Sequence, residues 1–199
     1  LIHSLAQASA SGLDDANIST ALEAAWPALG IDSIWLAEQE KQRAVDAITN
    51  YAVWDAKESA TFATAGLEVG VDHIFTVDDL ADFGITTEDI ASVDATTVPV
   101  RVKGRIDRLE RTDAGQYVIV DFKTGKTVPS KKDTQDNAQL ALYQLALSGS
   151  DKDTTPVVKA KLVYLRPRSG SLGERDQQAL DADERKRWRL ALQTAASAT

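Results

Sequence analysis

The sequence predicts an α/β fold in which a central mixed β-sheet is flanked by helices. Three observations favour this class. Helical patterns occupy residues 1–66, four strand-like runs follow within residues 67–166, and helical patterns lie before and after the last of these runs. Helices and strands that alternate along the second half of a chain are typical of α/β proteins. A length of 199 residues suits one substantial domain that covers residues 1–199.

The composition excludes several classes of protein. Hydrophobic residues make up 43% of the chain and charged residues 26%, which is typical of globular domains. Cysteine is absent, so disulfides, thiolate zinc sites, iron–sulfur clusters and cysteine nucleophiles are excluded. The sequence contains no run of 18 apolar residues, so no membrane-spanning helix is predicted. No signal-peptide pattern opens the chain. Because methionine is absent and the chain starts at Leu1, we expect a fragment of a larger protein.

The N-terminal part is predicted to be helical. Residues 1–10 have the pattern of a helix end, and a second helix over residues 14–25 is ended by Pro27. Apolar residues then recur at helical spacing over residues 32–64, which predicts a long helix, either continuous or interrupted near Asn50. Residues 67–77 alternate loosely and predict the first strand.

The next elements are predicted from turn residues and alternation. Residues 78–97 are acidic and rich in turn-forming residues, so we expect an insertion with one short helix. Residues 98–109 and 116–123 are strand-like and are joined by a polar turn that ends at Gly115, which predicts a β-hairpin over residues 98–124.

The remaining chain completes the predicted α/β order. Residues 136–148 have a helical pattern that ends at Gly149, and residues 157–165 alternate as a further strand. The charged residues 174–197 predict a C-terminal helix.

Charge is distributed unevenly along the chain. The net charge is −8, which by itself disfavours a polyanionic partner. Residues 1–100 carry 3 basic and 17 acidic side chains, whereas residues 101–132 carry 9 basic and 4 acidic ones. The central block therefore has a balance of +5 and can attract a polyanion locally.

The predicted hairpin carries a group of residues suited to metal chemistry. Asp121 and Lys123 are two positions apart on one strand, so their side chains share a face. Asp107 lies on the partner strand, close enough for two carboxylates to converge on one cation. Oxygen ligands of this kind suit Mg²⁺ or Mn²⁺, and the lysine can stabilise negative charge on a phosphate or an attacking hydroxide.

The same triplet also has a structural interpretation. An aspartate and a lysine at this spacing are commonly a solvated surface pair, and short motifs match by chance. Here three apolar residues, Val118, Ile119 and Val120, come directly before Asp121. This strand is therefore predicted to be buried, where an unpaired carboxylate is costly.

Three motifs together resemble a known family. The pattern G-R-I-D-R, then V-I-V-D-F-K-T-G, then Q-L-A-L-Y over residues 98–147 resembles the RecB-type branch of the PD-(D/E)XK nuclease superfamily. Within that branch it is similar to the C-terminal nuclease domains of bacterial helicase–nucleases such as RecBCD, AddAB and the actinobacterial AdnAB. The resemblance implies a restriction-endonuclease-like core.

The resemblance assigns a role to each matching residue. Asp107 and Asp121 would be metal ligands, with the main-chain carbonyl of Phe122 in the same coordination sphere. Lys123 would be the catalytic lysine. Gln139 and Tyr143 match the Q-x-x-x-Y motif and, four residues apart on a helix, would share one face that points to the site or to the DNA backbone.

Three further residues have weaker assignments. His3 lies in the pattern I-H-x-L and would be another metal ligand in the family, although a lone histidine is more often structural. Glu68 falls where many relatives carry a strand glutamate near the site. His73 has no motif around it and is interpreted as structural.

Basic residues near the motifs are candidates for DNA contacts. Such residues bind phosphates without reading bases, which gives affinity that depends on salt and little on sequence. The alternating Arg101, Lys103 and Arg105 fit a solvated strand face equally well. The DNA-binding candidates are Arg105, Arg108, Lys126, Lys131 and Lys132.

The resemblance therefore implies a Mg²⁺- or Mn²⁺-dependent deoxyribonuclease, most simply an exonuclease domain in double-strand-break repair. A helicase domain of the same polypeptide would supply the DNA, with a second helicase–nuclease subunit as a further partner, in the cytoplasm at the nucleoid. Two alternatives remain at this point. One is a non-catalytic DNA-end-binding or protein-docking module with the same fold, and the other is a stand-alone exonuclease or a restriction-type endonuclease.

Overall fold

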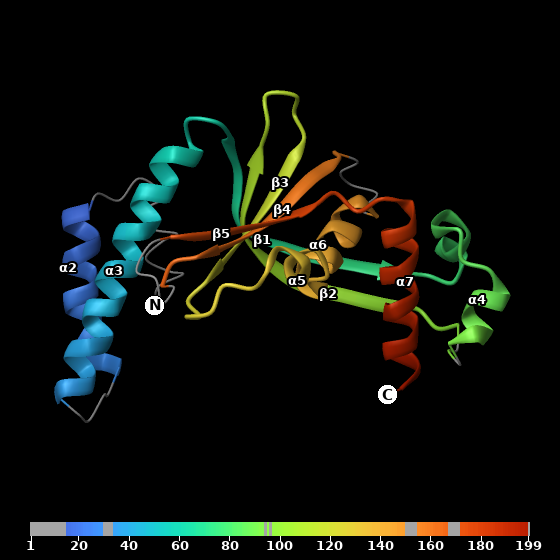
Figure 1. Cartoon of the computed structure of the whole chain (residues 1–199), viewed down its shortest axis with the longest axis horizontal. Coiled ribbons are helices and arrows are strands. Elements are labelled where there is room, and N and C mark those ends of the chain that lie inside the picture. Colours follow the sequence, from blue (N-terminus) through green and yellow to red (C-terminus); the bar gives the residue numbers. More distant parts are fainter. Residues whose placement is uncertain are drawn as a thin grey trace.

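The computed structural model describes residues 15–29, 34–93, 95, 97–149, 155–166 and 172–198. In these residues the chain forms a five-stranded sheet in the order β1-β2-β3-β4-β5. Figure 1 shows the sheet in the middle of the molecule, with α2 (Asp15–Ala25) and α3 (Ile34–Glu58) at one end and α7 (Ala182–Ser197) at the other. The predicted α/β class with a mixed sheet flanked by helices is confirmed.

The strands follow the chain order from one edge of the sheet to the other. Their bounds are β1 Ala63–Phe75, β2 Val100–Arg111, β3 Tyr117–Lys123, β4 Val157–Tyr164 and β5 Gly173–Gln178. β3 and β4 pair in parallel, and the β1–β2, β2–β3 and β4–β5 pairs are antiparallel. The predicted hairpin is therefore β2–β3, and the parallel β3–β4 pair is connected through the helices that carry the second half of the site.

Several helices begin or end where the sequence signals predict. η1 (Trp26–Leu29) follows α2 at the predicted proline break, and α6 (Ala138–Ser148) begins after the cap residue Asn137, whose side chain accepts from the Leu140 N–H at 3.0 Å. The long helix α3 ends at Glu58 rather than near residue 64, because β1 already starts at Ala63. α5 (Lys131–Gln135) is a short helix between β3 and α6.

The C-terminal region differs from its prediction. Residues 173–178 form the edge strand β5 rather than the start of a helix, and α7 begins only after Asp181, which caps it together with Glu184. β5 reads GERDQQ, so its sequence carries none of the β-branched or aromatic residues that indicate a strand. It is held in the sheet by pairing with β4 from Tyr164–Gly173 to Lys159–Gln178.

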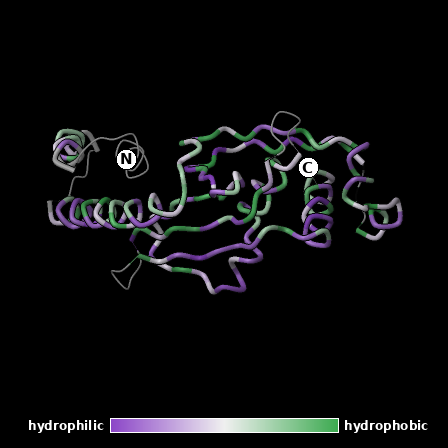
Figure 2. Tube along the Cα trace, turned by 90° about the horizontal axis from the view of Figure 1, so that it is seen from above, coloured by the Kyte–Doolittle hydropathy of each residue, from purple (hydrophilic) through white to green (hydrophobic). Residues whose placement is uncertain are grey.

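The two faces of the sheet pack against different helices. Tyr117 and Ile119 of β3 belong to the core beneath α6, whereas Val118, Val120 and Phe122 pack against α3. β3 is therefore buried on both faces, which explains its continuous apolar run. Polar and apolar residues alternate along the trace of α3 in Figure 2, as expected for a helix with one buried side.

The described residues between 78 and 97 form a small lobe beside α7 (Figure 1). Within its described part are two short helices, η2 (Asp78–Phe83) and α4 (Thr87–Ser92), instead of the single one predicted. Leu80, Ile85 and Ile90 make a small core of their own, and Lys186 of α7 forms an ion pair with Asp89 at 2.8 Å.

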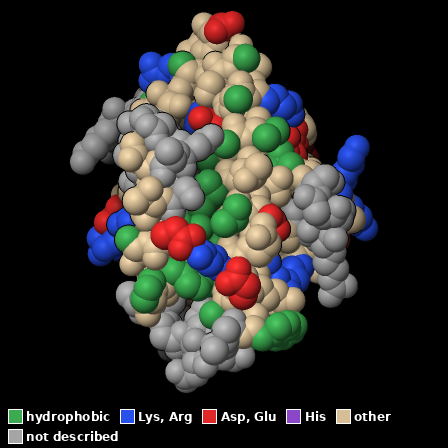
Figure 3. Space-filling view, turned by 90° about the vertical axis from the view of Figure 1, so that its left-hand side faces the viewer, with side chains coloured by type: hydrophobic (Ala, Val, Ile, Leu, Met, Phe, Trp, Pro, Cys, Tyr) green, Lys and Arg blue, Asp and Glu red, His purple; other side chains and the backbone are tan. Residues whose placement is uncertain are grey.

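The α2–α3 end of the molecule presents apolar side chains to solvent. Figure 3 views this end and shows hydrophobic side chains along its middle. On α3, Trp35 is 72% and Val53 is 64% exposed.

None of the described helices is both long enough and apolar enough to cross a membrane.

Candidate active site

The β2–β3 hairpin places Asp107 beside the main chain of Phe122. The hairpin ladder runs from Arg111–Tyr117 to Arg108–Val120, and Asp107 is the next residue of β2. Its Oδ2 accepts a hydrogen bond from the Phe122 N–H at 2.7 Å. The first candidate carboxylate is thus held against the backbone of the strand that carries the second one.

Asp121, Lys123 and Gln139 form a compact polar group. Asp121 is 3% exposed, and its Oδ2 lies 2.6 Å from Lys123 Nζ. The Gln139 side chain joins both residues, because its Nε2 donates to Asp121 Oδ1 and its Oε1 accepts from Lys123 Nζ, each at 2.7 Å. A buried carboxylate is expensive unless it is paired, so these contacts are what allow Asp121 to sit in the sheet.

Tyr143 connects α6 to β2. Its hydroxyl donates to the main-chain carbonyl of Arg105 at 2.7 Å and lies 3.2 Å from Gln139 Nε2. The phenol ring passes so close to Gly104 that a Cβ there would stand 2.8 Å from Tyr143 Cε1. Glycine at this position therefore allows the helix to approach the strand, and the two motif residues of α6 share one face as predicted.

The alternation of β2 reverses at Asp107. Ile106 and Leu109 both belong to the core beneath α6, although they are three residues apart, and Arg108 points to the α3 face. On β1, Glu68 lies opposite Asp107, because Leu67 pairs with Arg108 and Val69 with Ile106. Glu68 has φ 50°, a left-handed conformation that non-glycine residues rarely adopt. The left-handed residue of β1 and the break in the alternation of β2 therefore lie opposite each other, at the candidate site.

The donor set suits a hard divalent cation. Asp107, Asp121 and the Phe122 carbonyl offer only oxygen atoms, which Mg²⁺ and Mn²⁺ prefer. Among the described residues no group of three or more His, Cys, Asp or Glu side chains lies together, so any such ion would rely on these two carboxylates, the main chain and water. In this structure the Asp121 carboxylate is paired with the Lys123 ammonium and accepts a hydrogen bond from the Gln139 amide. The residues present therefore fit the predicted ion, and His3 lies outside the described residues.

The predicted basic residues do not all lie together. Arg105 is exposed and forms an ion pair with Glu68 at 3.3 Å, and Arg101 pairs with Asp72 at 2.5 Å on the same side of β2. Lys103 is exposed between them. The loop and short helix that lead from β3 to α6 carry a second exposed group, Lys126, Lys131 and Lys132.

Arg108 corrects the expectation for the DNA-binding set. Its side chain is 1% exposed and lies on the α3 face, where it forms ion pairs with Asp55 and Glu110 and stacks over the Trp54 ring at 5.1 Å. A guanidinium enclosed in this way does not reach a phosphate. The physical reason is that α3 covers this part of β2 and supplies Tyr51, Asp55 and Trp54 as partners, whereas regular alternation would have placed Arg108 with Ile106 beneath α6.

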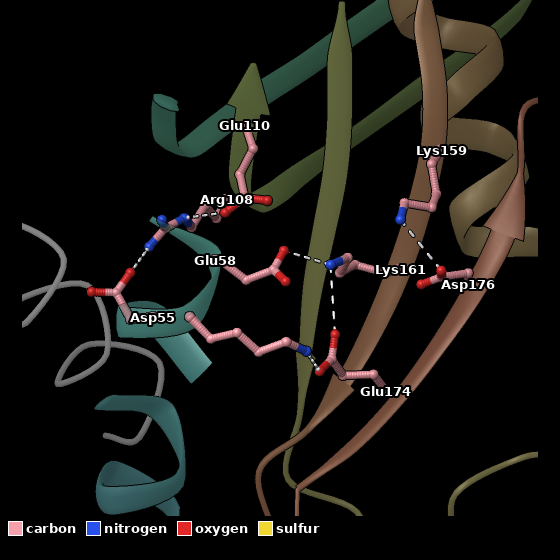
Figure 4. A network of polar contacts seen from close by, with 9 residues as sticks. Asp55, Glu58, Arg108, Glu110, Lys159, Lys161, Glu174 and Asp176 are labelled. Atoms are coloured by element: carbon pink, nitrogen blue, oxygen red, sulfur yellow. Dashed lines mark hydrogen bonds and ion pairs between the residues drawn. The ribbon is translucent and has the colours of Figure 1, made fainter. Parts of the chain in front are cut away.

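Arg108 belongs to a larger buried network of charges (Figure 4). Lys161 of β4 is 3% exposed and lies 2.5 Å from Glu58 and 3.5 Å from Glu174, and Lys57 binds Glu174 at 3.0 Å. Burial raises the pKa of the Glu110 carboxyl to about 7, with the nearby Glu58 charge acting in the same direction. The network joins α3 to β2, β4 and β5 directly behind the candidate site.

Two residues near the site were missed from the sequence. Tyr164 lies beside Lys123 in the β3–β4 register, and burial raises the pKa of its hydroxyl. Gln177 of β5 is fully buried and bonds to the turn before α6. The charged pattern of residues 174–197 predicts a helix, so no signal in the sequence places Gln177 near that turn. His73 stacks edge-on against Phe75 at 4.4 Å, in keeping with a structural role.

These features define an α/β protein with two carboxylates, a lysine and an amide on and beside a central strand. A family model for the PD-(D/E)XK nuclease superfamily matches residues 1–199, and the chain belongs to this superfamily of nucleases. Among solved structures, the crystal structure of SSO0001 is similar with a TM-score of 0.43 and 17% identity, covering 98% of this chain and 83% of that one. A search of curated protein sequences found no match.

Proposed function

We propose that this chain is a Mg²⁺- or Mn²⁺-dependent deoxyribonuclease domain that hydrolyses phosphodiester bonds at the β2–β3 hairpin. The observation that carries the proposal is the convergence of Asp107, Asp121 and Lys123 at one end of the hairpin. Asp107 Oδ2 lies against the Phe122 N–H, and Asp121 Oδ2 lies 2.6 Å from Lys123 Nζ. Membership in a nuclease superfamily supports the same reaction class.

Each residue has a separate part in the proposal. Asp107, Asp121 and the Phe122 carbonyl would hold the divalent ion, which when bound would lower the pKa of a water molecule and neutralise phosphate charge. Lys123 places a positive charge where negative charge develops on the phosphate. Gln139 orients both Asp121 and Lys123 through its two amide atoms. Tyr143 links Gln139 to β2, because its hydroxyl contacts the Gln139 amide and donates to the Arg105 carbonyl.

The basic groups on either side of the site would bind the substrate backbone. Arg105 from β2, and Lys126, Lys131 and Lys132 from the β3–α6 connection, are all exposed. Contacts of this kind are sequence-independent and weaken with salt. The sequence resemblance to helicase–nucleases further favours an exonuclease that receives DNA from a helicase domain of the same polypeptide.

The test compares metal binding with cleavage in matched variants. Asp107→Asn and Asp121→Asn keep the side-chain shape but remove one charge, and Asp113→Asn changes an exposed aspartate in the turn of the same hairpin. We expect the first two to lose Mn²⁺ binding in calorimetry and cleavage of linear DNA, while Asp113→Asn retains both. Intact closed circles under conditions that degrade linear DNA would identify an exonuclease.

The alternative outcomes are distinct. Cleavage that persists in a purified Asp121→Asn preparation contradicts the assignment of the site. A wild-type chain that binds DNA ends but neither binds Mn²⁺ nor cleaves DNA would support the non-catalytic docking module instead.

A further inference from the structure

The edge strand β5 contains a buried amide that reaches the start of α6. Gln177 is 0% exposed, and its Nε2 donates to three main-chain carbonyls, those of Thr134 at 3.3 Å, Gln135 at 3.0 Å and Asn137 at 3.0 Å. An amide has two hydrogens, so at least one of them is shared between two carbonyls. One side chain thus provides a hydrogen-bond donor both to main-chain carbonyls at the end of α5 and to the carbonyl of the residue that caps α6.

A second buried amide fixes the orientation of the first. Gln144 of α6 is 3% exposed and donates from Nε2 to Gln177 Oε1 at 2.9 Å and to the Gln178 carbonyl at 3.2 Å. Its Oε1 accepts from the Leu180 N–H at 3.2 Å. Because Gln177 Oε1 is held by a donor, Nε2 must face the carbonyls of the α5–α6 turn.

The turn held by Gln177 carries one residue of the candidate site. Asn137 caps α6, and Gln139 follows two positions later with both its amide atoms bound to Asp121 and Lys123. A small rotation at the start of α6 would move the Gln139 amide away from these partners, since hydrogen bonds weaken steeply with misalignment.

We propose that Gln177, oriented by Gln144, is a positioning residue that sets Gln139 against Asp121 and Lys123. This inference rests on the proposed nuclease function for its catalytic consequence, and on geometry alone for its effect on Gln139. It gives β5 a part in the site although the strand does not touch the reacting groups.

The first experiment measures the position of Gln139 without any reaction. The Gln139 side-chain amide signals in a ¹⁵N-edited NMR spectrum are assigned by their loss in Gln139→Ala. We expect Gln177→Met, which keeps the side-chain length and removes the donors, to move these signals toward the position of a free amide. The control is Gln178→Met, because Gln178 is the exposed neighbour on the same strand. Signals that stay unchanged in Gln177→Met would overturn the inference.

The second experiment is a double-mutant cycle on cleavage. Gln177→Met should lower kcat about tenfold or more with KM changed less than about threefold, as for residues that orient a site from outside it. In the Gln139→Ala background the same change should have an effect of less than about twofold, because the residue it positions is gone. An undiminished loss in that background would show a general structural role and overturn the inference.

A second variant keeps the test open if Gln177→Met does not fold. Gln144→Met removes the donor that orients Gln177, together with the contacts to the Gln178 carbonyl and the Leu180 N–H, and the same NMR and kinetic results are expected in weaker form. A wild-type chain that cleaves no DNA would contradict the proposed function, whereas the NMR comparison would still decide whether Gln177 positions Gln139.

Discussion

The Phe122 N–H donates to Asp107 Oδ2 at 2.7 Å, so a carboxylate of one strand is bound to the main chain of the next. This bond lies just beyond the Arg108–Val120 pair that ends the β2–β3 ladder, because it joins the next residue of β2 to the second residue after Val120 on β3. The side chain therefore continues the connection between the strands where the ladder itself ends. It also fixes Asp107 beside the Phe122 peptide and next to Asp121, which is the arrangement a shared cation requires.

Lys123 is predicted to act in the reaction rather than in metal binding. In Lys123→Met the ammonium no longer competes with a cation for Asp121 Oδ2, so Mn²⁺ affinity measured by calorimetry should stay the same or rise. Loss of a charge directed at the phosphate should lower kcat by about 10²- to 10³-fold.

Lys126→Met provides the contrast for this prediction. Lys126 is exposed and is assigned to contacts with the DNA backbone, so its loss should raise KM. The slope of log affinity against log salt concentration should become shallower by less than about one unit. Weaker Mn²⁺ binding in Lys123→Met with an unchanged kcat would contradict the assigned role.

Arg108 is predicted to matter for stability. At pH 8, where Glu110 is ionised, Arg108→Met leaves Asp55 and the buried Glu110 without their shared cation, and removing one partner of a buried ion pair typically destabilises by about 3–5 kcal/mol. Chemical denaturation measures this loss. Arg101→Met, which breaks an exposed pair with Asp72 on the same strand, should leave the free energy of unfolding nearly unchanged. Equal effects of the two substitutions would contradict the prediction.

The buried Glu110 carboxyl should make stability fall as pH rises. Its pKa is raised by burial from 4.5 to about 7, so the folded chain keeps a proton that the unfolded chain releases near pH 4.5. The contribution is complete below about pH 4.5 and is lost as pH rises to about 7, by about 3 kcal/mol.

The measurement is the free energy of unfolding between pH 4.5 and pH 8 in Glu110→Gln and wild type. The difference between them should change with pH over this range, because glutamine does not titrate. Glu38→Gln, an exposed change on α3, should follow the wild-type curve. A Glu110→Gln curve parallel to wild type would contradict the assignment.

Gly104 should tolerate no side chain. In Gly104→Ala the new Cβ would stand 2.8 Å from Tyr143 Cε1, so the ring must move and weaken its bond to the Arg105 carbonyl. We expect a loss of about 1–3 kcal/mol in stability and a lower kcat. Gly70→Ala on β1 is the matched control, since nothing lies within 4 Å of its added Cβ. A fully active and stable Gly104→Ala would contradict the close packing of Tyr143.

Much of the fold and of the candidate site could be predicted locally. The hairpin, the helix with Gln139 and Tyr143, and the shared face of Asp121 and Lys123 depend on spacings that strand and helix geometry fix over a few residues. The buried strand before Asp121 was visible as a continuous apolar run. These predictions needed no knowledge of what lies far away in the sequence.

Other features were decided only by tertiary structure. Residues 173–178 became a strand because β4 offered an edge to pair with, although their own sequence is polar. Arg108 lies in a buried network rather than in the expected DNA-facing set because α3 covers this part of β2 and supplies Asp55 as a counter-charge. Gln177 reaches the α6 turn across more than 35 residues of chain.

Sequence spacing alone was enough to predict which residues share a face in the regular elements β3 and α6, because backbone geometry repeats there with a fixed period, but it did not predict the reversal within β2. Which face is buried, and which distant elements meet there, could be seen only in the folded chain. Pairing and burial depend on contacts between residues far apart in the chain, and those contacts brought Gln139 to Asp121, Gln177 to the turn before Gln139, and Arg108 away from the surface.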